Sequence, residues 1–187
     1  MSARTERMVD FYDASRQTIV LSEQIHDISY GIWAEAARGV RFQPWTIDGV
    51  DEMERDGALI QIDPGHRTPL QYIESDTTMY EVPLKGKLLL LSVSPEGRFS
   101  IDDFNSEISS SSYMYELKKG SYLCWYASPD QTEPAEVLEY EEPGFKASKL
   151  LTVGPGINRG FGGHPIPGDL RTALEVLDEQ TRLAQTR

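Results

Sequence analysis

The sequence is poor in the side chains that most often bind transition metals. Its 187 residues include one cysteine, Cys124, and three histidines, His26, His66 and His164. One cysteine excludes an intrachain disulfide and a zinc site built from several thiolates, and a reducing cytoplasm is the simplest environment for such a chain. Cys124 lies in the middle of the run SYLCWYAS. We therefore interpret it as a buried, inert thiol rather than a nucleophile.

Positive charge and long apolar runs are also scarce. The chain has 18 basic and 30 acidic side chains and a formal net charge of -12. Such a field repels phosphate backbones and anionic membrane surfaces, so neither nucleic acid nor a membrane is expected as a partner. The longest apolar run, Leu88–Leu91 extended by Val93, is far shorter than the roughly 20 residues of a membrane helix. The polar start of the sequence lacks the apolar core of a signal peptide, and we expect a cytoplasmic protein.

What the sequence does contain is a series of short strand-like runs. From Ala58 onward, runs rich in β-branched and aromatic residues are bounded by Gly, Pro, Asp or Ser. They read ALIQID, TPLQYIES, TMYEVPL, KLLLLSVS, SYMYEL, SYLCWYAS, AEVLEYEE and SKLLTVG. Regular short strands with turn signals predict a closed or sandwiched antiparallel β fold. We expect the polar segment 101–112 to be a long loop.

Helical periodicity is seen near both ends of the chain. A helix over 23–38, ended by Gly39, is predicted from spacings of four, three and four between Leu21, Ile25, Ile28 and Ile32. The stretch before it fits a short helix followed by a strand or turn. After the Gly- and Pro-rich segment 154–168, a second helix is predicted behind Asp169 as N-cap, with an apolar face of Leu170, Ala173, Leu174 and Leu177.

Two glycine-led turns, in VPLKGKLLLL and LKKGSYLCWYAS, resemble the motifs of the cupin superfamily of double-stranded β-helix (jelly-roll) barrels. The resemblance covers roughly Gly39 to Gly154. It implies a mainly β fold with a cupin-like antiparallel barrel over residues 40–154. An N-terminal helical segment over 1–39, and the Gly/Pro loop with the C-terminal helix over 155–187, would pack on the barrel as parts of one domain.

The positions that bind metal in this family carry other residues here. Anchoring the first motif on Gly86 places Met79 at the family's glutamate and Tyr72 with Glu74, or Ile73 with Ser75, at its two histidines. Anchoring the second motif on Gly120 places its Pro, Gly, His and Asn positions at Tyr126, Ser128, Gln131 and Ala135. No position carries histidine, so we expect no metal and no other cofactor. A carboxylate site of Glu74, Glu81 and His66 is the alternative.

Strand alternation places Tyr72 with Glu74, and Met79 with Glu81, on common faces, which the resemblance makes interior faces. A carboxylate inside an apolar barrel holds a proton more tightly, which suits it to general acid or base catalysis. The candidate catalytic residues are Glu81, Tyr72, Glu74 and His66, with His66 as a proton shuttle at the barrel mouth. The candidate substrate-binding residues are Gln131, Met79, Tyr126 and Trp125.

Each candidate also has an ordinary structural interpretation. The carboxylates could be solvated at the barrel rim or paired with Arg or Lys, the histidine could be a solvated loop residue, and the aromatic residues could be core.

Two functional hypotheses follow. The first is a metal-independent enzyme that isomerises, eliminates from or cyclises a small apolar or ring-containing metabolite. The second is a non-catalytic small-molecule-binding or regulatory cupin-like domain. In both, the partner is a small molecule. We also expect a homodimer, because the apolar faces of terminal helices need partners.

Overall fold

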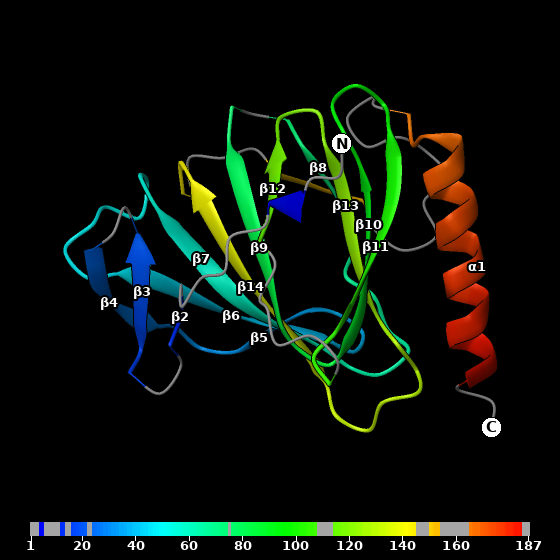
Figure 1. The fold of residues 1–187 in the computed structure, drawn as a ribbon, viewed down its shortest axis with the longest axis horizontal. Coiled ribbons are helices and arrows are strands. Elements are labelled where there is room, and N and C mark those ends of the chain that lie inside the picture. The colour runs from blue at the N-terminus through cyan, green and yellow to red at the C-terminus, as the bar shows by residue number, and fades with distance from the viewer. Residues whose placement is uncertain are drawn as a thin grey trace.

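The protein is described from a computed structural model, which covers residues 4–5, 12–13, 16–21, 24–74, 76–107, 114–144, 150–153 and 165–184. Within these residues the chain forms two curled antiparallel sheets and one C-terminal helix. The fold is therefore mainly β, as the sequence predicts (Figure 1).

The larger sheet contains ten strands. They are β1 (Arg4–Thr5), β2 (Tyr12–Asp13), β3 (Thr18–Leu21), β4 (Gln24–Tyr30), β5 (Ala34–Ala37), β6 (Val40–Ile47), β7 (Asp56–Ile62), β9 (Thr78–Lys85), β12 (Met114–Lys118) and β14 (Ala135–Glu142). Their order is β1-β12-β9-β14-β7-β6-β4-β3-β2, and β5 pairs with β6.

The smaller sheet contains five strands. They are β8 (Leu70–Ile73), β10 (Lys87–Val93), β11 (Phe99–Asn105), β13 (Tyr122–Ala127) and β15 (Leu150–Val153), in the order β11-β10-β13-β8-β15. Strand β8 therefore joins the smaller sheet and the next strand, β9, joins the larger one. This alternation of the chain between facing sheets brings residues distant in sequence into one core.

The space between the sheets is filled by an apolar core, here called the interior core. The larger sheet contributes residues such as Ile60, Met79 and Val137, and the smaller sheet contributes Leu90 and Trp125. All five are at least nine-tenths buried. Burial of apolar surface of this kind is the main favourable term in folding.

Helix α1 (Gly168–Ala184) covers the outer face of the smaller sheet, and Figure 1 shows it alongside β10 and β11. Its residues Leu170, Leu174 and Leu177 pack against side chains of that face. The predicted C-terminal helix is thus confirmed, but its N-cap is Pro167 rather than Asp169, because the Arg171 N–H donates to the Pro167 carbonyl. Asp169 lies in the first turn. In the described part of the chain, no helix is long and apolar enough to cross a membrane.

A third cluster lies on the outer face of the larger sheet, where the N-terminal strands pack. Ile19, Ile28 and Ile47 meet Trp45 there, and the Trp45 ring stacks near Tyr140. A Cβ on Gly57 would lie 2.1 Å from the Glu139 carbonyl and 2.3 Å from the Trp45 ring. Glycine is therefore required at this position, where β7 pairs with β14.

The helix predicted over 23–38 is wrong, because this segment forms β4 and β5. The apolar residues that matched a helical face do not share a buried face: Ile28 is buried, whereas Ile25 is 72% and Ile32 is 88% exposed. Pairing of β4 with β3 and β6 decides the conformation. Tertiary pairing here overrides the local periodicity.

The eight strand-like runs predicted from Ala58 onward all contain strands, namely β7 to β10 and β12 to β15. The loop predicted over 101–112 is wrong in its first part, because β11 extends to Asn105 and pairs with β10. Residues 108–112 of that prediction lie outside the described residues. Most of the predicted Gly/Pro loop, including His164, also lies outside them.

Candidate functional site

Glu81 lies in the middle of β9, with Tyr115 of β12 on one side and Glu139 of β14 on the other. Its side chain is 0% exposed. The next residue, Val82, belongs to the cluster on the outer face of the larger sheet, whereas Met79 belongs to the interior core. Alternation along β9 thus directs Glu81 into the barrel.

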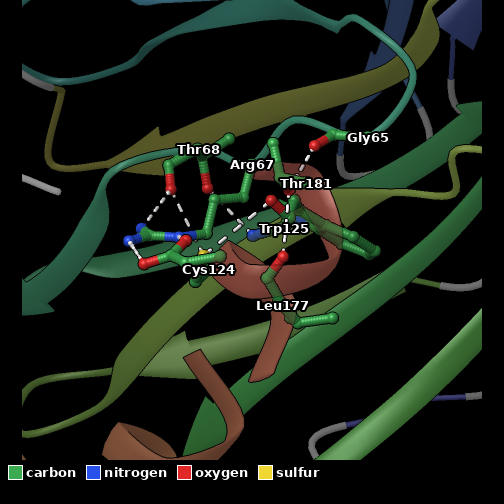
Figure 2. A network of polar contacts seen from close by, with 8 residues as sticks. Gly65, Arg67, Thr68, Cys124, Trp125, Leu177 and Thr181 are labelled. Atoms are coloured by element: carbon green, nitrogen blue, oxygen red, sulfur yellow. Dashed lines mark hydrogen bonds and ion pairs between the residues drawn. The ribbon is translucent and has the colours of Figure 1, made fainter. Parts of the chain in front are cut away.

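Trp125 of β13 holds the Glu81 carboxylate from the opposite sheet. Its indole Nε1–H donates to Glu81 Oε2 at 3.1 Å, and its ring meets the Tyr115 ring edge-on at 5.6 Å between centroids. The backbone N–H of Trp125 donates to Thr68 Oγ1 at 2.9 Å (Figure 2). This bond holds the part of β13 that carries the indole ring. Glu81 Oε1 makes no hydrogen bond with the described residues.

Two further carboxyl groups of β14 accompany Glu81. Glu139 is 7% and Glu141 is 0% exposed, and alternation places both on the face that Val137 presents to the interior core. Glu139 lies directly across from Glu81, and their carboxyl groups are within hydrogen-bonding reach. Glu139 Oε2 makes no hydrogen bond with the described residues.

Burial controls the protonation of these carboxyl groups. It raises the pKa of Glu81 to about 8, although the hydrogen bonds with Trp125 and Glu139 oppose the rise. Burial and then the charge of Glu81 raise the pKa of Glu139 well above its usual range. Two carboxyl groups can share a hydrogen bond only if one of them keeps a proton. The pair can therefore hold and deliver a proton near neutral pH.

The residues present do not fit a transition metal at the positions that the cupin motif uses. Ile73 and Met79 lie in the interior core and offer no imidazole or carboxylate, and Tyr72 packs under α1. Glu74 is the one carboxylate at these positions. Among the described residues, no group of three or more His, Cys, Asp or Glu side chains is arranged to hold a metal ion.

The structure brings three of the predicted site residues together, namely Glu81, Met79 and Trp125. Tyr72 and Tyr126 lie instead among the side chains that pack under α1. The interior orientation predicted for Tyr72 is wrong because the β8–β13 register pairs it with Tyr122, whose ring it contacts at 4.7 Å.

The other predicted residues lie on connecting segments. Glu74 follows the end of β8 and is half-buried. His66 lies in the loop before β8, where its Nδ1 is 3.1 Å from the Pro64 carbonyl. Gln131 lies in the turn between β13 and β14 and accepts a hydrogen bond from the Lys87 N–H at 2.7 Å.

A pocket of about 480 Å³ opens between the β10–β11 hairpin and β12, so both sheets line it. Its wall includes Ser92, Ser100, Phe99 and Lys118, and Leu117 of the interior core. Leu117 shares a strand face with Tyr115, the cross-strand neighbour of Glu81. The pocket therefore reaches the edge of the interior core at Leu117, although Glu81 itself is buried and does not line it.

Glu139, Glu141 and Tyr115 were missed by sequence reasoning. The run AEVLEYEE carries the signal for the two glutamates, because alternation places them on the same face as Ala135 and Val137. That run was interpreted only as a strand. Which of its faces is interior was not readable from the run itself.

No protein-family model and no curated protein sequence matches the chain. Solved structures match its fold. An oxalate decarboxylase, solved in a study of its substrate binding mode and reaction specificity switch, aligns at a TM-score of 0.50 and 12% identity over 65% of this chain and 30% of that one. Vicilin from Solanum melongena, described as having different anionic ligands in structurally similar pockets, aligns at 0.50 and 10% identity over 66% and 33%.

The chain thus spans about a third of the length of these matched structures. One of them is named a decarboxylase and the other a vicilin, and both are at most 12% identical to this chain, so the likeness concerns the fold and leaves catalysis open. Both are cupin-fold proteins with curled antiparallel sheets. The chain has the cupin fold.

Proposed function

We propose that this cupin-fold chain is a metal-independent enzyme that uses Glu81 as a proton donor and acceptor on a small organic molecule. The observation that carries the proposal is the buried Glu81–Glu139 pair, in which burial raises the pKa of Glu81 to about 8. General acid–base groups work best when their pKa lies near the working pH. Perturbed carboxyl groups of this kind concentrate at functional sites.

The reaction class follows from what this pair can supply. At pH 7 a carboxyl group with a pKa near 8 is mostly protonated, so Glu81 donates a proton first and then accepts one. Isomerisation, elimination and cyclisation need such transfers and no oxidant. Trp125 orients the carboxyl group, and the pocket between the sheets admits the substrate. Tyr72 and Tyr126 are no longer candidates for this site, because they pack under α1, and Glu74, His66 and Gln131 lie on connecting segments that do not line this pocket.

A second candidate function is non-catalytic binding of a small molecule. The observation that favours it is the apolar filling of the barrel, where Ile60, Leu90 and Leu123 belong to one continuous buried core. In that case the carboxyl pair would be a structural feature and the pocket between the sheets would bind the ligand.

The test begins with the molecule that co-purifies with the protein, identified by native mass spectrometry and then offered as substrate. Glu81→Gln keeps the shape of the side chain but removes its titration. We expect turnover to fall by about 10²–10⁴-fold. Glu136→Gln is the matched control, because Glu136 lies on β14 but accepts a hydrogen bond from Gln61 rather than joining the buried pair. Normal turnover by Glu81→Gln with retained binding would favour the second candidate.

A further inference from the structure

A second pocket, of about 310 Å³, lies where α1 meets one end of the barrel. Three segments form it: the turn between β5 and β6, the loop before β8, and the C-terminal half of α1. Its lining residues are Ala37, Arg38, His66, Arg67, Pro69, Asp178, Thr181 and Arg182. Three guanidinium groups and an imidazole thus surround one carboxylate, in a chain whose net charge is -12.

Two of the three arginines already have counter-ions. Arg67 Nε and Nη2 donate to the two oxygens of Asp178 at 2.6 and 2.9 Å. Arg182 is held in the same bidentate way by Glu179, at 2.9 and 2.6 Å. Arg38 is exposed, and it makes no hydrogen bond or ion pair with the described residues. The pocket therefore carries one uncompensated positive charge, on Arg38.

The walls of this pocket are fixed by backbone contacts. Gly39 has a φ of +71°, and a Cβ there would lie 2.5 Å from the His66 ring, so the turn that carries Arg38 rests directly on His66. The Asp63 N–H donates to the Gly39 carbonyl at 2.8 Å, and the Ala127 N–H donates to the His66 carbonyl at 2.9 Å.

The helical wall is fixed as well. The Thr181 hydroxyl donates to the Gly65 carbonyl and so ties α1 to the same loop (Figure 2). The backbone that carries Arg38, His66 and Arg67 is thus held in place before any ligand arrives. Such preorganisation reduces the ordering cost of binding.

We propose that this pocket binds a small molecule through a carboxylate or phosphate group, with Arg38 as the residue that engages the anion. A guanidinium matches both groups with two parallel hydrogen bonds. The volume is at the lower end of the range for small-molecule sites, which suits a ligand of metabolite size. A local positive charge favours anion binding in this pocket against the negative field of the rest of the chain. The site does not depend on Glu81.

Isothermal titration calorimetry with inorganic phosphate and with malonate tests this proposal at low ionic strength. We expect saturable binding at one site per chain, with affinity falling about 10-fold or more in Arg38→Gln. Arg38→Lys keeps the charge and should lose less than Arg38→Gln. Arg41→Gln is the matched control, because Arg41 is an exposed arginine of β6 that lines neither this pocket nor the pocket between the sheets. Tighter binding of phosphate indicates a phosphorylated ligand, and tighter binding of malonate indicates a carboxylate.

Unchanged affinity in Arg38→Gln, equal losses in Arg38→Gln and Arg41→Gln, or no saturable binding of either anion would overturn the proposal. Both side chains are exposed, so we expect both variants to fold. A thermal melt of each variant checks this. The same titration with Glu81→Gln should give wild-type affinity, so failure of this site and failure of the proposed catalysis are distinguishable.

Discussion

At the scale of single residues, the protein keeps a carboxyl group where burial strongly disfavours its charge. Glu81 gains one hydrogen bond from Trp125, yet its Oε1 has no hydrogen bond with the described residues. An uncompensated buried charge is among the costliest features that a fold can contain. The group therefore stays protonated over much of the neutral range, and its ionisation should appear in the stability of the protein.

Stability should fall as the pH rises. The folded pKa of Glu81 is about 8, above its ordinary value of 4.5, so the native state binds more protons than the unfolded state between these limits. The contribution is fully present below about pH 4.5 and is lost as the pH rises through about 8. At roughly 1.4 kcal/mol per unit of pKa difference between the folded and unfolded states, the change in the free energy of unfolding is on the order of a few kcal/mol. Urea unfolding between pH 5 and 9 measures it.

Glu81→Gln provides the control, because it removes this titration and should flatten the profile. A residual slope in the same direction is expected from Glu139, whose pKa is also raised. Identical slopes in the wild type and in Glu81→Gln would contradict the burial of a titrating Glu81.

Trp125→Phe should shift the pH at which this loss of stability occurs to a higher value. The substitution removes the one indole donor to Glu81 Oε2, so the charged carboxylate loses stabilisation and the pKa rises further. Trp45→Phe is the matched control: Trp45 is equally buried, but its Nε1 makes no hydrogen bond with the described residues. If the two variants give the same pH midpoint, the Trp125 hydrogen bond does not control Glu81.

At the scale of elements, α1 is docked by one shielded ion pair as well as by its apolar face. Arg67 is 9% exposed and Asp178 is 45% exposed, and Arg67 Nη1 also donates to the Thr68 carbonyl at 3.3 Å. The thiol of Cys124 donates to that carbonyl at 3.2 Å, and burial raises the pKa of this thiol. The interpretation of Cys124 as a buried residue is confirmed. Figure 2 shows Arg67, Thr68 and Cys124 close together beside α1.

Asp178→Asn should destabilise the protein by about 1–3 kcal/mol, because it leaves the Arg67 charge shielded from water without its partner. Half of the pair faces solvent, which keeps the loss below that of a fully buried pair. Glu179→Gln, on the same helix, breaks an exposed pair with Arg182 and should change stability by about 0.5 kcal/mol or less. Urea unfolding of the two variants compares them. Equal small effects would show that the Arg67 pair contributes no more than a surface pair.

At the scale of the whole molecule, the two sheets and α1 leave apolar side chains uncovered on β4 and on the segment between β4 and β5. Ile25 and Ile32 are largely exposed. Isolated exposed apolar residues are common on monomers, but these two lie on β4 and just after it, and only the short strands β3 and β2 separate β4 from the edge of the larger sheet.

We expect a homodimer, and light scattering should give twice the chain mass of 21.1 kDa. Ile32→Ser should shift the equilibrium toward the monomer, whereas Val176→Ser, a change at an exposed position on α1, should not. A monomer at high micromolar concentration would refute the prediction.

The sequence by itself determined the β class, the positions of the strands from Ala58 onward, and the pairing of Met79 with Glu81 on one strand face. These features depend on alternation and turn residues, which act over a few neighbours. It also identified Glu81 as a carboxylate for the barrel interior. The C-terminal helix followed from its own periodicity.

Only the tertiary structure decided which strand faces are interior and which residues meet across strands. Tyr72 faces α1 because β8 pairs with β13 in one register, and a shift of one residue would have reversed its face. Glu139 meets Glu81 only through the β9–β14 register. The segment 23–38 has helical spacing, but it forms strands because β3 and β6 pair with β4. Pairing between distant strands is a property of the whole chain, and no local pattern contains it.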